Sequence, residues 1–130
     1  MNPILKNILA VLAGIIVGMI VNMGIIMMSG SVIPLPEGVD PAIPESLKAN
    51  IHLFEAKHYI MPLLAHALGT LARAFVCAKI AANNKLRLAL VIGIFFLIGG
   101  VMTSFQIGSP LSANLIDWIF AYIPMAWLGW

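Results

Sequence analysis

The residues best suited to chemistry in this 130-residue chain include two histidines and a glutamate in one short stretch, His52-x-x-Glu55-x-x-His58. Imidazole and carboxylate groups together suit zinc or iron. On a straight helix, however, His52 and His58 project about 120° apart and are separated by roughly 9 Å of rise. Of the three, only Glu55 and His58, at positions i and i+3, are therefore close enough to share one metal ion. The favoured interpretation is that these polar residues anchor a helix at the membrane surface, and a metal ion held by Glu55 and His58 is the alternative.

Three further polar residues, Asn22, His66 and Asp117, fall inside long apolar stretches. A polar or ionisable group in a bilayer is costly unless it faces the bundle interior or water. By helical rise, each of the three lies about 9–12 Å inside the outer end of its stretch, so they share one depth. This placement predicts either an outward-facing polar pocket, with His58 and Glu55 at its rim, or a structural layer of hydrogen bonds between helices.

Arg73 is a further charged residue inside an apolar stretch, about 9 Å from Lys79 along the same helix. We expect its long side chain to extend toward the lipid phosphates at the inner surface. The alternative is a contact with a substrate or with a lipid headgroup.

The composition of the chain indicates what kind of structure positions these groups. The chain is 62% hydrophobic and 9% charged, whereas soluble proteins are about 25% charged. One compact core of this length cannot bury so much apolar side chain, so lipid must surround it. The sequence predicts an all-α membrane protein in a single domain, residues 1–130, with four transmembrane helices at about 4–28, 59–80, 86–103 and 111–128.

The segment between the first two apolar stretches, residues 29–57, has a different character. Its first half holds four prolines and Gly38, which exclude a continuous helix and predict an external loop. From Glu45 onward, Leu47, Ile51 and Phe54 recur at i, i+4 and i+7. This periodicity predicts a short amphipathic helix on the membrane surface.

Two prolines bear on the course of the membrane helices. Pro62 and Pro124 lie in the second and fourth apolar stretches, where each ring opposes the carbonyl four residues earlier. We expect a break or kink at both places. Transporters use broken helices of this kind to bind their substrates.

The distribution of charge predicts an orientation. Five of the seven basic residues belong to one side of the predicted bundle: Lys6, Arg73, Lys79, Lys85 and Arg87. Because cytoplasmic segments are enriched in lysine and arginine, both termini are expected in the cytoplasm. All carboxylates and histidines then belong to the outer half. The cations form no stripe with interleaved aromatic residues, so nucleic acid is not an expected partner.

Small residues in the first apolar stretch recur every four positions, as Ala10, Gly14 and Gly18, and Asn22 continues the series. Such spacing lets helix backbones approach closely. The third stretch offers a second face of this kind, with Ala89, Gly93 and Gly100. Both faces are expected to pack within one subunit, with packing between subunits or against another protein as the alternatives.

The stretch from His52 to Thr70, HLFEAKHYIMPLLAHALGT, together with the four-span plan, resembles small inner-membrane proteins of bacteria that have no assigned activity. The resemblance implies the same class and a bacterial inner-membrane location. It supplies no catalytic residue.

No nucleophile triad, phosphate-binding glycine loop or cofactor motif is present, so the sequence does not favour an enzyme and predicts no cofactor. The favoured interpretation is a non-catalytic membrane component that oligomerises or serves as an accessory subunit, with lipid and itself or another membrane protein as partners. A transporter of a small molecule or ion, using the outer polar pocket, is the first alternative. A metal-dependent membrane enzyme is the second.

Overall fold

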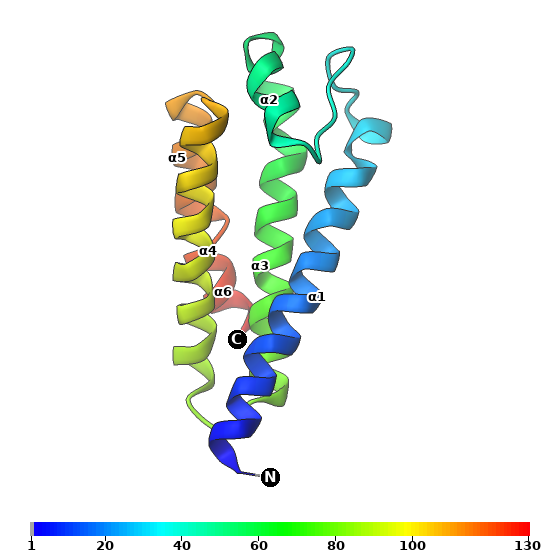
Figure 1. Cartoon of the computed structure of the whole chain (residues 1–130). Coiled ribbons are helices and arrows are strands. Elements are labelled where there is room, and N and C mark those ends of the chain that lie inside the picture. The colour runs from blue at the N-terminus through cyan, green and yellow to red at the C-terminus, as the bar shows by residue number, and fades with distance from the viewer. Residues whose placement is uncertain (1) are drawn as a thin grey trace.

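The protein is described over residues 2–130 by a computed structural model, and this part of the chain is helical with no strand (Figure 1). Four segments are long and apolar enough to cross a membrane. They are α1 (Pro3–Val32), the segment Ala56–Ile80 that contains α3 (Ile60–Ile80), α4 (Lys85–Ile107), and the segment Leu111–Gly129, which is divided into α5 (Leu111–Phe120) and α6 (Ile123–Gly129). The predicted fold class, a four-span all-α membrane protein, is confirmed.

Helix α1 begins where Asn2 accepts a hydrogen bond from the backbone N–H of Ile4 (2.8 Å) and Pro3 occupies the first helical position. Its 30 residues extend about 45 Å, beyond the roughly 30 Å hydrocarbon core. The helix crosses α3 at an angle and diverges from the rest of the bundle toward the loop end (Figure 1).

Helix α1 packs mainly against α3, and small residues on α1 allow the two backbones to approach closely. Ala10, Gly14 and Gly18 are all buried. A Cβ atom on Gly14 would lie 2.6 Å from the backbone oxygen of Arg73 and 3.3 Å from the Cβ of Cys77. At the far end of the pair, Asn7 ties α1 to the turn after α3, donating to Asn83 (2.8 Å) and accepting from the N–H of Ala82 (2.9 Å).

The connection between α1 and α3 contains a shorter helix, α2 (Pro44–Asn50), followed by two 3-10 turns, η1 (Ile51–Leu53) and η2 (Ala56–Tyr59). The predicted surface helix is therefore present but shorter than its apolar periodicity suggested. It ends at Asn50, where φ and ψ of −115° and 6° leave the α-helical region, and the 3-10 turn η1 that follows ends where the backbone becomes extended at Phe54 and Glu55. Helix α2 contacts α4, so this connection lies across the end of the bundle.

The fourth membrane segment is broken between Phe120 and Ile123, as the proline at position 124 predicts. Helix α6 then packs against α3 and α4, and its Gly129 lies against the Leu71 carbonyl. The chain consequently ends partway along the bundle (Figure 1).

Candidate functional site

The central contact of the bundle interior joins α3 to α5. His66 Nδ1 lies 2.7 Å from Asp117 Oδ1, the distance of a strong, charge-assisted hydrogen bond. The His66 side chain is 34% exposed and that of Asp117 only 14%. The carboxylate is thus held inside the bundle, while the imidazole retains access to its edge.

Tyr122, which lies in the break between α5 and α6, contacts both Asp117 and His66. Its hydroxyl donates to the second carboxylate oxygen, Asp117 Oδ2 (3.4 Å), and its ring stacks on His66 with centroids 5.8 Å apart. In a continuous helix, residues five apart point about 140° away from each other. The break at residues 121–122 is what returns Tyr122 to Asp117. Gly100 of α4 makes room, because a Cβ there would collide with the tyrosine hydroxyl.

Arg73 lies deeper along α3 and is 4% exposed. Its guanidinium carbon sits 3.7 Å from the centroid of the Phe96 ring, a cation–π contact. Its stem fills the space that Gly18 leaves open on α1, and one guanidinium nitrogen lies beside Gly69. Instead of extending to the inner surface as expected, the side chain points back along its own helix into the bundle, as helical side chains commonly do.

Three buried polar atoms near this guanidinium have no hydrogen-bond partner: Asn22 Oδ1, Thr70 Oγ1 and Arg73 Nε. Thr70 and Arg73 are neighbours at i and i+3 on α3, and Asn22 of α1 packs against Gly69, the residue before Thr70. A buried polar group left unpaired costs about 1–3 kcal/mol. Water or a small ligand would supply the hydrogen bonds that these three atoms lack.

The structure brings together part of the polar layer predicted from the sequence. His66 and Asp117 are in direct contact. Asn22 instead lies beside Gly69, about one helical turn deeper than His66, next to Arg73. The predicted pocket residues therefore divide into two neighbouring groups along α3, one at His66 and one at Arg73.

His58 and Glu55 bind each other's backbone at the start of η2. The N–H of Glu55 donates to His58 Nδ1 (2.7 Å), and the Glu55 side chain accepts from the N–H of His58. This reciprocal cap turns the His58 ring onto Phe54, with centroids 5.3 Å apart. Residues 2–130 contain no cluster of three or more His, Cys, Asp or Glu side chains able to hold a metal ion. Glu55 and His58 thus cap a helical turn in this structure, and a metal ion held by this pair stays an alternative.

The second small-residue face of the sequence also lies within the chain. A Cβ on Gly93 would meet the Cβ of Ala126 at 2.8 Å, and Gly100 adjoins Tyr122. Together with Gly14 and Gly18 on α1, these glycines are covered by helices of the same subunit. None of the four is free to receive another chain.

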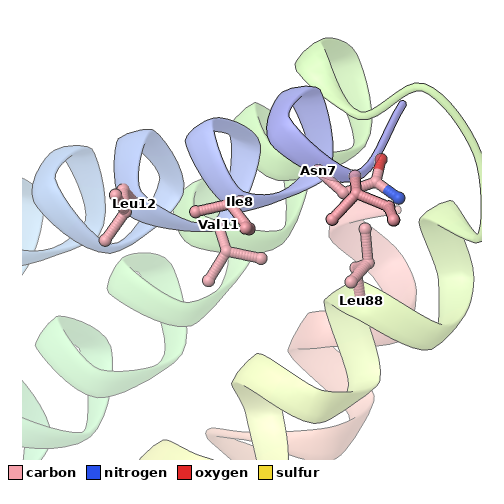
Figure 2. Close-up of a pocket in the computed structure, with 6 residues that line it drawn as sticks. Asn7, Ile8, Val11, Leu12 and Leu88 are labelled. Atoms are coloured by element: carbon pink, nitrogen blue, oxygen red, sulfur yellow. The ribbon is translucent and has the colours of Figure 1, made fainter. Parts of the chain in front are cut away.

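Two cavities lie away from the polar interior. The first, of about 320 Å³, opens between the starts of α1 and α4 and is apolar except for Asn7 (Figure 2). Because the Asn7 amide is already bonded to the turn at residues 82–83, this cavity offers mainly a hydrocarbon surface. The second, of about 250 Å³, is bordered by Lys79, Lys85 and Trp130. Neither is lined by the residues predicted to form a polar pocket.

Tyr122, Thr70 and Phe96 are interior residues that sequence reasoning missed. One signal for Thr70 was available, since His66, Thr70 and Arg73 are spaced by four and then three residues and so share one face of a helix. Tyr122 gave no such signal, because its position depends on the break that precedes Pro124. Phe96 looks like any lipid-facing aromatic residue in an apolar stretch.

The chain matches no protein-family model, no curated protein and no solved structure. The polar interior of the bundle is therefore the basis for inferring function.

Proposed function

We propose that this small integral membrane protein transports a small ion or solute, and that His66 and Asp117 exchange a proton during transport. The proposal rests on the 2.7 Å contact between His66 Nδ1 and Asp117 Oδ1 inside the bundle. Chains of histidine and carboxylate groups within membrane helices mark proton and ion pathways. Imidazole can accept a proton at one ring nitrogen and donate one from the other, which suits it to this exchange.

The exposure of the pair supports a path for the proton. His66 is one-third exposed and Asp117 is largely enclosed, with both carboxylate oxygens engaged by His66 and Tyr122. A proton entering from the edge of the bundle would meet the imidazole first. The helix break beside Tyr122 resembles the discontinuous helices on which transporters build their sites.

We also propose the orientation, with both termini in the cytoplasm of a bacterium and the chain in its inner membrane. Basic residues gather at the end of the bundle where Asn7 bonds to the turn after α3: Lys6, Lys79, Lys85 and Arg87. An excess of cations at one end is typical of the cytoplasmic side.

A proton-flux measurement tests the transport proposal. Purified protein is reconstituted in liposomes loaded with a pH-sensitive dye in potassium chloride, and a pH gradient is imposed with valinomycin present. We expect proton entry faster than in protein-free liposomes, and roughly 10-fold or more slower entry in His66→Gln and Asp117→Asn because the exchanging groups are lost. His52→Gln, which changes an exposed histidine outside the spans, is the matched control. Equal rates with and without the protein would refute transport, as would an undiminished rate in His66→Gln.

A second candidate, an oligomerising or accessory membrane component, is favoured by one observation. Helix α1 packs almost entirely against α3, which leaves most of its circumference uncovered. A partner would have to contact the large side chains there, such as Ile16, Ile20 and Met27, because α3 already occupies the small-residue face. Mass measurement in mild detergent and in nanodiscs tests this candidate. A single copy with no bound protein in both media would exclude stable oligomerisation.

A further inference from the structure

The charge on Arg73 is buried without an anion. Arginine stays protonated in proteins, and a buried charge is stable only when it is paired and hydrogen-bonded. The ion pairs among residues 2–130 are Lys57–Glu55 and His66–Asp117, so no carboxylate contacts the guanidinium. The Phe96 ring faces it, but a cation–π contact offsets only part of the cost of removing an ion from water.

The groups around Arg73 are those that would bind an anion. Arg73 Nε and the Thr70 hydroxyl are buried donors without partners. The Asn22 side chain adds an amide whose NH₂ group can turn inward by rotation about its last bond. Two of the three residues, Thr70 and Arg73, are more than nine-tenths buried. Guanidinium and hydroxyl donors together are a recurring means of holding small anions.

The balance of charge indicates when an anion would be held. With His66 neutral, the interior contains the positive Arg73 and the negative Asp117. With His66 protonated, it contains two positive groups and one negative, and one monovalent anion would restore neutrality. The titratable groups in contact with His66 are Asp117 of α5 and Tyr122 of the α5–α6 break. Arg73 lies about two turns away on the same helix, and the nearby residues of α1 and α4 are neutral: Asn22 lies beside Gly69, Phe96 against Arg73, and Gly100 against Tyr122.

We propose that Arg73, Thr70 and Asn22 form a subsite for a small monovalent anion, such as chloride, nitrate or formate, which is bound together with a proton on His66. The inference rests on the proposed transport function and names its substrate class. Arg73 packs closely against Gly18 of α1 and Gly69 of its own helix, so an anion bound beside the guanidinium would have to be small. The anion would reduce the cost of burying the guanidinium charge, and the proton would supply the positive charge that draws the anion in.

Anion binding is measured separately from flux, by thermal unfolding of the purified protein in detergent. Sodium chloride, nitrate and formate are titrated at constant ionic strength against sodium gluconate, whose anion is too large, at one pH below and one above the usual histidine range. We expect a saturable rise in Tm with the small anions that is larger at the lower pH. Arg73→Gln should abolish it, and the exposed Arg87→Gln should leave it unchanged.

Because Arg73→Gln removes a packed side chain, Thr70→Val provides a milder test. Valine has nearly the shape of threonine, so the variant removes only the hydroxyl donor, and the anion should bind roughly 3- to 30-fold more weakly. Thr103→Val is the matched control, because the Thr103 hydroxyl bonds to the Gly99 carbonyl of its own helix. A wild-type Tm that responds equally to gluconate, or not at all, would overturn the subsite and indicate that water fills it. So would an unchanged affinity in Thr70→Val.

The transport proposal and the anion-subsite proposal can be refuted independently of each other. Specific anion binding without proton flux in liposomes would contradict transport and leave the subsite in place. Proton flux without anion-dependent stabilisation would contradict the subsite and leave proton exchange at His66 and Asp117 in place.

Discussion

The pairing of α1 with α3 can be tested by adding one methyl group at Gly14. An alanine Cβ at this position would lie 2.6 Å from the Arg73 carbonyl oxygen, whereas ordinary contacts begin at 3.4 Å. The helices would have to separate by about 0.8 Å, the difference between these distances. A backbone oxygen cannot rotate away as a flexible side chain can. Overpacking of this kind costs about 1–3 kcal/mol.

Gly24→Ala on the same helix supplies the control, because a Cβ there meets nothing within 4 Å. Both substitutions gain the helix propensity of alanine, so this term largely cancels between them. We therefore expect Gly14→Ala to lower the free energy of unfolding by about 1–3 kcal/mol relative to Gly24→Ala. Reversible unfolding in mixed micelles with increasing dodecyl sulfate, followed by circular dichroism, measures the difference. Two variants of equal stability would show that α1 and α3 do not approach as closely as described.

Two other substitutions test the interior contacts by the same unfolding measurement. Asp117→Ala should cost about 1–3 kcal/mol, because it leaves the His66 imidazole and the Tyr122 hydroxyl without their shared acceptor; no loss of stability would argue against that contact. Gly100→Ala should also destabilise the bundle, by about 1–3 kcal/mol, since its Cβ collides with Tyr122, while the neighbouring Gly99→Ala has open space and should not. Equal effects of the two glycine substitutions would contradict the placement of the tyrosine.

The four spans and the helix between the first two were predictable, because they depend on local properties of the chain. Apolar length decides whether a helix can cross a bilayer. Pro124 removes a backbone donor and so breaks the fourth span wherever that span packs. The end of the surface helix was harder to place, because the apolar residues at 47, 51 and 54 continue the helical period past Asn50, where α2 ends.

The polar interior was predictable only in part. Depth along each helix placed Asn22, His66 and Asp117 in one layer, but helical rise says nothing of which side of a helix faces which neighbour. The contact between His66 and Asp117 therefore came from packing. The same limit applies to Arg73, since the expectation of an extended side chain ignored the space that Gly18 leaves on the facing helix.

The sequence by itself determined that this is a helical membrane protein with ionisable groups inside its spans, because composition, apolar length and proline chemistry act within single segments. Only the tertiary structure decided that Tyr122 joins His66 and Asp117, and that Arg73 is buried beside Thr70 and Asn22 without a carboxylate. These arrangements depend on the rotation and close approach of helices far apart in sequence. That approach is set by where the glycines of one helix meet the side chains of the next.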